Sequence, residues 1–491
     1  MNLRITNLFH VSTKVGRPLK NYCSDQDLSL VSRKVPRNRG NHSNAFRINE
    51  AWGDNYLTAL IFDFFFIKKK ERKDHNRSNS LLPISPALVV LCLTFLSTTS
   101  IAQTTIESYQ QVAAKNNPDL KASYVEFEAA LQRENQVTAL ADPRLSFGYF
   151  ISPIETRVGP QRAKVSLSQL FPWFGTLKAK GNRANYLAEA KYQSFINDRN
   201  KLFWEVNIAY YPLYELHQHV QLLTQNLKIL KTYKRLATSS FENNRGSMVD
   251  VIRVDIMIEN AETELVILNN QTIPLQVRFN KLLNRSDSIP VIISDLTELL
   301  TIEKDYRRDS LLVGNPMIES LELQQKAMQE SELLARKSAL PQFGVGLDYA
   351  FIAERSEVSI PDNGKDAFMP MVSISLPIFR KRYSAAIKEA KLSQKAIEYR
   401  KKAIENSLVS NYENASFQLH KATDLIALYN LQIIKTKQLI QLLYSSYSNS
   451  AKGFEEVLRI QQQLLKYQMA KATAKKNYKV SLAEIEYLTS K

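Results

Sequence analysis

Cysteine is almost absent from this sequence. The 491 residues include two cysteines, Cys23 and Cys92, and no cysteine follows residue 92. The remainder of the chain therefore excludes both a disulfide framework and thiol chemistry. A Gly-rich phosphate loop and a Ser/His/Asp set are also missing. His217 and His219 are two positions apart, a spacing that points them to different faces of a helix and argues against a metal site. We expect no enzymatic activity and no cofactor.

Glycine and proline are absent from one very long stretch. Residues 383–452 contain neither, and Ala, Leu, Ile, Lys, Glu and Gln dominate them. One continuous helix there would be about 105 Å long. Residues 176–240 form a matching span, in which Gly181 and Pro212 are interruptions and Pro212 predicts a kink. Shorter helical patterns cover residues 106–140, 248–283, 306–339 and 454–488. Such lengths indicate coiled-coil packing.

Charged side chains are absent from residues 81–102. This stretch is apolar, follows the basic residues 68–77, and ends in Ser100-Ile101-Ala102. The pattern predicts a secretory signal peptide that is cleaved after Ala102. A transmembrane anchor is one alternative, although the apolar run is shorter than the ~20 residues of a spanning helix. A lipidated Cys92 is a second alternative, but no small residue directly precedes it.

The excess of positive charge is concentrated before the signal peptide. The whole chain has a net charge of +17, yet residues 1–80 hold 15 Lys/Arg against 7 Asp/Glu. Residues 103–491 keep 50 basic and 41 acidic side chains, a net charge of +9. We therefore expect no nucleic-acid partner. Residues 1–80 have no periodic pattern, and we interpret them as a disordered extension or the product of an over-called start site.

The rest of the sequence contains two related halves. Asn-Pro at residues 117–118 recurs at 315–316, and Pro143 recurs as Pro341, each 198 positions later. Further along the offset grows to 205 and 206, so the second copy has about seven extra residues near 354–367, where we expect a loop insertion. The chain then divides into an extension, a signal peptide, a first repeat and a second repeat: residues 1–80, 81–102, 103–300 and 301–491.

Each half also contains short segments in which apolar and small or polar residues alternate. This period of two predicts one β-hairpin in each repeat, with an apolar face. The apolar positions are Leu145, Phe147, Val165, Leu167, Val345, Leu347, Tyr349, Val372, Ile374 and Leu376. The small or polar positions on the other face include Ser166, Ser168, Asp348, Ser373 and Ser375.

The apolar face of these hairpins has two interpretations. One is a half-buried sheet on a soluble domain. The other is contact with lipid, which the export signal and the very long flanking helices favour. Strands in lipid must close into a barrel, and four strands are fewer than the roughly eight of the smallest membrane barrels. The second interpretation therefore predicts an oligomer that shares one barrel with a polar interior.

These features together resemble the TolC-like outer-membrane efflux proteins. The resemblance covers residues 104–490 and depends on Asn-Pro at the start of each repeat, on Leu376-Pro377-Ile378-Phe379, and on Tyr447-x9-Val457-Leu458-x2-Gln461-x2-Leu464. It implies a mainly α fold with a small β part, assembled as a homotrimer with a twelve-stranded barrel in the outer membrane and a twelve-helix barrel in the periplasm. It also implies docking to a periplasmic adaptor (membrane fusion protein) of an inner-membrane pump.

The turns farthest from the strands are the expected docking sites for the adaptor. Their residues are Asn244, Arg245, Gly246, Ser247, Ala451, Lys452 and Gly453. Gly246 and Gly453 are one position out of register, so the two turns need not be equivalent. Asp250 aligns with Glu456, and with Asp255 they are candidates for an acidic gate that favours cations. The alternative is that acids in a first helical turn complement the helix dipole.

Further alternatives concern the function of the whole protein and the location of its aromatic residues. Within the same class, the chain is a conduit for secreted polypeptides. In a different class, it is a periplasmic coiled-coil scaffold or adaptor, although an adaptor would usually contain a single helical hairpin. Trp173 and Phe174, beside Pro172, suit either a membrane interface or a core at the junction of strand and helix.

Overall fold

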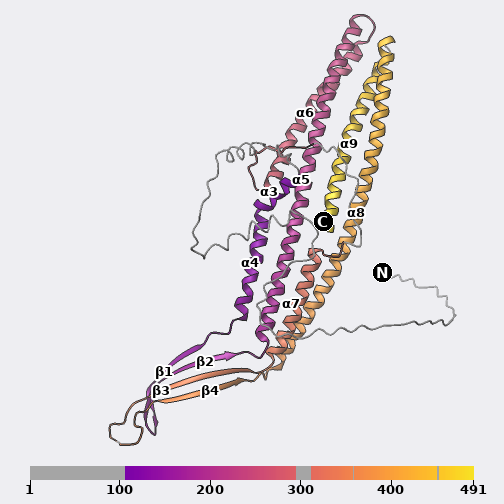
Figure 1. The fold of residues 1–491 in the computed structure, drawn as a ribbon. Helices are drawn as coiled ribbons and strands as arrows, with labels where there is room; N and C mark the ends of the chain where they lie inside the picture. The colour runs from indigo at the N-terminus through magenta and orange to yellow at the C-terminus, as the bar shows by residue number, and fades with distance from the viewer. Residues whose placement is uncertain (1–105, 295–310, 358, 451–452, 491) are drawn as a thin grey trace, which may run out of the picture. The chain divides into compact units, whose positions relative to one another are not determined.

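A computed structural model describes residues 106–294, 311–357, 359–450 and 453–490 (Figure 1). The predicted extension and signal peptide lie outside the described residues. The first repeat contains α3 (Ile106–Asn116), α4 (Pro118–Thr138), β1 (Arg144–Thr156), β2 (Gly159–Phe171), α5 (Thr176–Glu242) and α6 (Met248–Leu282). The second contains α7 (Pro316–Ser338), β3 (Gln342–Ile352), β4 (Ala367–Ser375), α8 (Arg380–Ser450) and α9 (Phe454–Thr489). Both predicted repeats thus contain a β-hairpin between a short helix and a long helical hairpin.

The helix expected over residues 106–140 is instead two helices. α3 ends at Asn116, and the side chain of Asn117 accepts hydrogen bonds from the backbone N–H groups of Asp119 and Leu120 in α4. Pro118 occupies the first turn of α4, where its missing N–H costs nothing, and its ring disfavours a helical conformation at the residue before it. The Asn-Pro dipeptide therefore breaks the helix that the apolar pattern alone predicts.

The two long helices are present at nearly the expected bounds. α5 has 67 residues and α8 has 71. Pro212 lies inside α5, and the helix continues through it. Gly181 is also inside α5 and fully buried, and a Cβ added there would lie 2.8 Å from the Thr138 side chain of α4. This glycine permits close packing of α4 on α5 and does not interrupt the helix.

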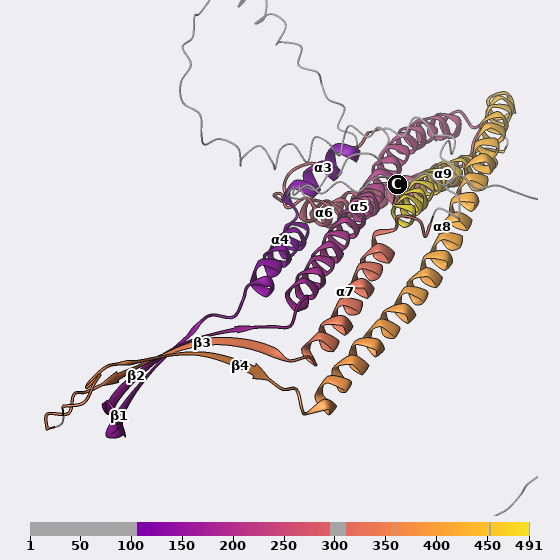
Figure 2. The same ribbon diagram turned by 60° about the horizontal axis from the view of Figure 1, so that its bottom comes forward.

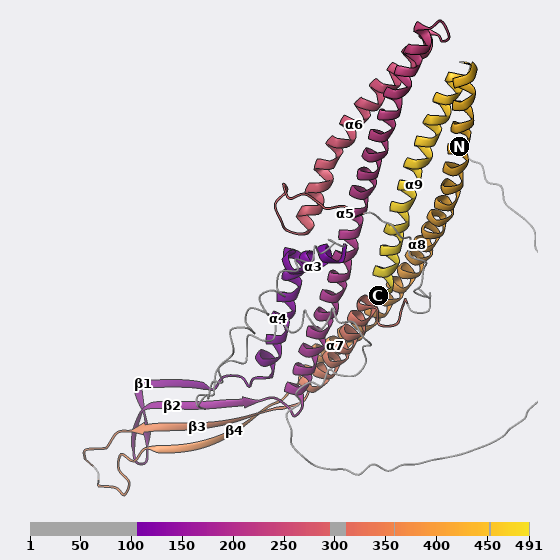
Figure 3. The same ribbon diagram turned by 45° about the horizontal axis from the view of Figure 1, so that its top comes forward.

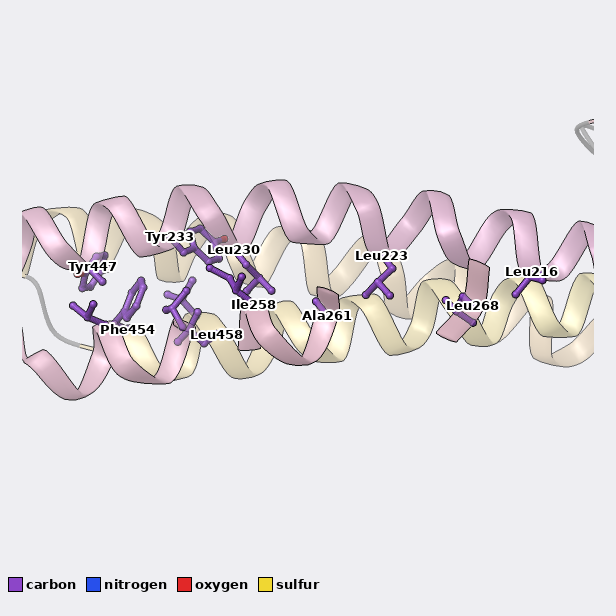
Figure 4. Close-up of a cluster of buried hydrophobic side chains, with 14 residues drawn as sticks. Leu216, Leu223, Leu230, Tyr233, Ile258, Ala261, Leu268, Tyr447, Phe454 and Leu458 are labelled. Carbon is purple, nitrogen blue, oxygen red and sulfur yellow. The ribbon is translucent and has the colours of Figure 1, made fainter. Parts of the chain in front are cut away.

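The core between the helices has the seven-residue spacing of a coiled coil. Buried residues of α5 recur at Leu216, Leu223, Leu230 and Ala237. They face Val251, Val254, Ile258, Ala261 and Leu268 of α6, which follow a three-four spacing. Figure 4 shows Leu230, Tyr233 and Ile258 beside Phe454 and Leu458 of α9, with Leu223, Leu268 and Leu216 farther along the same row of buried side chains. Burial of this kind yields roughly 1.5–3 kcal/mol for each large side chain, so the cluster joins the two repeats.

The four strands form one antiparallel sheet in the order β1-β2-β3-β4 (Figure 2). The register places Phe147, Val165, Tyr349 and Phe368 opposite one another across all four strands. Since successive side chains point to opposite faces, the predicted apolar positions within the strands share one face. β4 ends at Ser375, so Leu376 lies one residue beyond the strand to which we assigned it. Strand pairing stops there because Gln342, opposite Ser375, begins β3.

The loop insertion lies where the repeat offset changes. Two residues join β1 to β2, whereas residues 353–366 join β3 to β4. The longer loop lies against the shorter turn: the Arg355 guanidinium donates to the Glu155 carboxylate at 2.5 Å and to the Thr156 carbonyl at 2.9 Å. The loop thus links the two hairpins at the end of the sheet opposite the helices.

Candidate functional site

The two faces of the sheet differ in chemistry. All of the predicted apolar positions are exposed except Val165, which is half-buried. On the other face, Ser166 lies opposite Asp348. Asp348 is 2% exposed and pairs with the Lys164 ammonium. A buried carboxylate needs such a partner, and Lys164 balances the charge of Asp348. Met369 and Met371 of β4 lie on the same face, opposite Asp348 and Gly346.

The sheet is open at both sides. Within the described residues, β1 has a partner only in β2, and β4 has a partner only in β3. An exposed, flat strand edge has unpaired N–H and C=O groups that pair readily with another chain. Pro370 lies in the edge strand β4. Proline is largely confined to edge strands because it has no N–H to donate to a neighbouring strand. Both edges are therefore available to further strands.

The outer helices also have apolar surfaces without a partner in the described chain. α5, α7 and α9 lie between α4 and α6 on one side and α8 on the other (Figure 3). The exposed apolar residues on α6 include Val249, Ile252, Ile256, Val266 and Ile273. Those on α8 include Leu392, Tyr399, Leu428, Leu431 and Leu442. None of the described helices has both the length and the apolar content that crossing a membrane requires.

The α5–α6 turn forms the tip of the first helical hairpin. Asn244 adopts a positive φ of 55°, a conformation that asparagine tolerates better than most residues. Arg245 is exposed, and its backbone N–H donates to the carbonyl of Ser240. Ser247 caps α6 by accepting from the N–H of Val249 at 3.1 Å. Gly246 is half-buried, and a Cβ added there would lie 2.9 Å from the Ser240 side chain.

The α8–α9 turn differs in construction. Ala451 and Lys452 lie outside the described residues. Gly453 has a φ of 85° and directly precedes α9. Among the described tip residues, Asn244 of the first turn and Gly453 of the second have positive φ, whereas Gly246 does not.

The candidate gate residues each lie beside a basic side chain. Arg253 is 3.6 Å from Asp250 and 3.3 Å from Glu455 of α9, so one guanidinium joins α6 to α9. Asp255 pairs with Lys234 of α5. These acids therefore form a network that connects helices, in addition to lying near helix N-termini.

Glu456 is paired within its own helix. The Arg459 guanidinium binds its carboxylate through two nitrogens, one of them 3.0 Å away. This hydrogen bonding, with the positive charge, lowers the pKa of Glu456 below its ordinary value. Glu456 therefore stays ionised at lower pH than an isolated glutamate.

The remaining residues singled out in the sequence have structural neighbours. His217 contacts Gln221 at 2.8 Å, and His219 contacts the carbonyl of Met469 at 3.2 Å. Trp173 stacks on Phe343 at 5.6 Å between ring centroids, whereas Phe174 is 79% exposed. Trp173 thus belongs to the junction between sheet and helix, and Phe174 to the surface. Across the described ranges, no group of three metal-ligating side chains is present.

Sequence reasoning missed a polar contact that joins the repeats. The amide of Gln461 in α9 donates to the Asn226 amide oxygen of α5 at 3.0 Å, and both residues are buried. Gln461 belongs to the pattern from Tyr447 to Leu464 on which the resemblance depends, and every named residue of that pattern is buried. The spacing gave no sign that Gln461 would find its partner in the other repeat.

Residues 308–490 match the profile of the outer membrane efflux protein family. No characterised protein matches the chain in sequence. Three solved structures have the same fold over 78% of the chain. They are CusC (TM-score 0.66, 15% identity, 91% of its chain covered), VceC of Vibrio cholerae (0.62, 15%, 96%) and MtrE of Neisseria gonorrhoeae in its open state (0.62, 17%, 88%).

These matches bear on the expectations drawn from the sequence. VceC is an outer membrane protein and MtrE an outer membrane channel, which agrees with the predicted location and transport class. The matched profile lies wholly within the second of the two predicted repeats. The predicted resemblance is thereby confirmed: residues 308–490 match the outer membrane efflux protein profile, and the chain has the fold of CusC, VceC and MtrE.

Proposed function

We propose that this protein is the outer-membrane channel of a tripartite efflux system and that three copies form one channel. The observation that carries the proposal is the four-stranded sheet, which has an exposed apolar face and two unpaired edges. In hydrocarbon, unpaired backbone groups cost several kcal/mol each, so a sheet in lipid must close on itself. Four strands cannot close alone, whereas three copies supply twelve.

The helices support the same arrangement. Next to the sheet, each chain contributes α4, α5, α7 and α8; toward the tip it contributes α6, α5, α9 and α8 (Figure 3). Three copies would therefore place twelve helices around the axis at either level. The apolar residues exposed on α6 and α8 would meet across each contact between copies, where coiled-coil packing would bury them. Such a tube continues the barrel through the periplasm.

The proposed transport is passive. The face of the sheet that carries Ser166, Ser168 and the Lys164–Asp348 pair would line the inside of the barrel. An inner-membrane pump would supply the energy, and a periplasmic adaptor would connect pump and channel. We assign adaptor docking to the two tip turns, at Asn244–Ser247 and around Gly453, because they lie at the end of the helices farthest from the sheet.

The tip also holds the proposed gate. Arg253 joins α6 to α9 through Asp250 and Glu455. Opening the tip would separate helical hairpins, so a pair that bridges them would favour the closed state. Around a threefold axis, Asp250 and Glu456 would add negative charge at the mouth and favour cations.

Conductance in planar lipid bilayers tests the proposal. The purified chain should insert from detergent and give discrete channels with a conductance that does not require a pump. A chain that stays soluble as a monomer after removal of its leader, and that leaves the bilayer intact, would contradict the proposal and favour a periplasmic scaffold.

A further inference from the structure

Both long helices begin next to the sheet with basic residues. α5 starts five residues after β2 ends, and α8 starts five residues after β4 ends. Neither helix has an acid in its first turn. Residues 172–188 and 376–388 contain seven basic side chains and no Asp or Glu: Lys178, Lys180, Arg183, Arg380, Lys381, Arg382 and Lys388. We call these seven residues the basic collar.

The collar is largely accessible. All of its members except Lys180 are exposed, and Lys180 is half-buried. No ion pair joins a collar residue to another residue of the described ranges. Glu332, on the neighbouring helix α7, binds Arg336 at 2.7 Å and lies 3.9 Å from Lys391 instead. The positive charge of the collar is therefore not balanced by acids of the same chain.

Helix electrostatics do not account for the collar either. The N-terminal end of a helix carries a partial positive charge and favours acids in its first turn. Arg380, Lys381 and Arg382 occupy that turn in α8, where they oppose the helix dipole. Arg183 and Lys388 recur at the same offset of 205 residues as Phe174 and Phe379. One basic position thus recurs at the equivalent place in both repeats, and the first turn of α8 carries its charge at some cost to that helix.

Large apolar side chains are exposed directly beside the collar. Phe174 is 79% exposed, Phe379 81% and Ile378 74%. Phe379 immediately precedes Arg380, so the surface changes from apolar to basic within one residue. This order matches the passage from the hydrocarbon of a bilayer to its headgroups, where aromatic side chains are enriched and Lys and Arg extend toward the polar layer.

We propose that the basic collar binds the phosphate groups of anionic phospholipids in the leaflet that faces the periplasm. This inference depends on the proposed function, because it requires the sheet to lie in the membrane. The polar layer on each side of a bilayer is roughly 5–8 Å thick. Arg183 and Lys388 lie about 10 and 12 Å along their helices, within reach of that layer for long side chains that extend back toward it. The lipid would supply the negative charge that the chain lacks.

Trp173 reports on lipids at this junction. The chain has three tryptophans, and Trp52→Phe with Trp204→Phe leaves Trp173 alone. In vesicles of phosphatidylcholine and phosphatidylglycerol, brominated forms of each lipid would quench its fluorescence in proportion to their local concentration. The test variant is Arg380→Gln with Lys381→Gln and Arg382→Gln. The matched control is Lys421→Gln with Lys435→Gln and Lys437→Gln, three exposed lysines farther along α8.

We expect the unmodified collar to prefer brominated phosphatidylglycerol fivefold or more, about the factor that one basic side chain near an anionic surface contributes. The preference should fall toward one in the test variant, remain in the control, and return when the three residues are all lysine. Equal quenching by both lipids before substitution, or an equal loss of the preference in the control, would contradict lipid binding by the basic collar. Neither result would contradict the proposed channel function. Absence of quenching by either lipid would instead contradict membrane insertion and the proposed function.

Discussion

The side-chain amide of Asn315 donates a hydrogen bond to the backbone carbonyl of Leu488, 3.2 Å away and 173 residues later in the chain. The same side chain accepts from the N–H of Met317, so it caps α7 and holds the end of α9. Asn117 makes the equivalent bond to the carbonyl of Leu282, at 3.1 Å. In both repeats one asparagine thus connects two helices end to end, and α7 continues the course of α9 (Figure 3).

Asn315→Ala should destabilise the protein more than loss of a helix cap alone. The cap is worth about 1 kcal/mol, and the buried Leu488 carbonyl left without a donor adds about 1–3 kcal/mol. Asn315→Asp keeps the acceptor for Met317 but cannot donate to Leu488. Its free energy of unfolding should therefore lie between those of the unsubstituted protein and Asn315→Ala, or below both. Urea unfolding followed by circular dichroism at fixed protein concentration measures both. Equal stability of all three proteins would refute the connecting role.

The buried Gln461–Asn226 pair should behave as a unit. Gln461→Leu leaves the Asn226 amide without its partner and should cost about 1–3 kcal/mol. Adding Asn226→Leu removes the unpaired group and should recover part of that loss. A double-mutant cycle on the free energy of unfolding gives the coupling. Additive losses would mean that the amides do not interact.

An arginine introduced at either of two adjacent positions of β2 should affect membrane insertion differently. Leu167 lies on the apolar face and Ser168 on the polar face, one residue apart. Leu167→Arg should destabilise the inserted state by about 2–4 kcal/mol near the bilayer midplane, whereas Ser168→Arg should insert and change conductance. The yield of folded protein in the membrane fraction compares them. Equal insertion of the two variants would argue against lipid contact by this face.

Removing acids at the tip should change ion selectivity. Asp250→Ala with Glu456→Ala removes two carboxylates near the proposed mouth, so the preference for cations should decrease. Reversal potentials across a salt gradient in planar bilayers measure this preference. Lys421→Gln with Lys435→Gln is a control that changes charge elsewhere on the chain. Ion selectivity that stays the same in the tip variant would contradict the acidic gate.

The tip should also respond to pH in a defined direction. Hydrogen bonds from Arg459 hold the pKa of Glu456 below its usual value, near 4.3 in unfolded chains. The stabilisation that this pairing adds is therefore complete above the ordinary glutamate range and is lost as the pH falls through the lowered pKa. In Arg459→Gln the pKa of Glu456 should rise. On acidification, the part of the cation preference due to Glu456 should therefore be lost at a higher pH than in the unsubstituted protein. A titration of reversal potential that is unchanged by this substitution would exclude Glu456 from the conduction path.

Much of the architecture could be predicted because its signals are local and repeated. The absence of Gly and Pro over residues 383–452 fixed α8 almost to its ends, and alternation located the strands within a few residues. The apolar pattern failed at Asn117, where capping and the ring of Pro118 outweigh helix propensity. The interruption expected at Pro212 is not present, because α5 continues through that residue.

The candidate site was harder to predict because its contacts join distant residues. The acids of the tip were recognised by their position, but their pairing through Arg253 depends on how α6 meets α9, which no spacing reveals. The Gln461–Asn226 bond spans 235 residues for the same reason. Asn244 has the positive φ of the first turn, a conformation that asparagine adopts more readily than other non-glycine residues.

Disulfide cross-linking between the edge strands tests the central claim most directly. With Cys23 and Cys92 replaced by serine, Phe147→Cys in β1 and a cysteine scanned from Phe368 to Val372 in β4 lie on opposite edges of one sheet, roughly 14 Å apart across three strand spacings. They therefore cannot join within one chain. The account predicts covalent trimers, and no larger species, for at least one position in the outer membrane. Monomers at every position, or an open series of ever larger species, would contradict a closed barrel built by three copies.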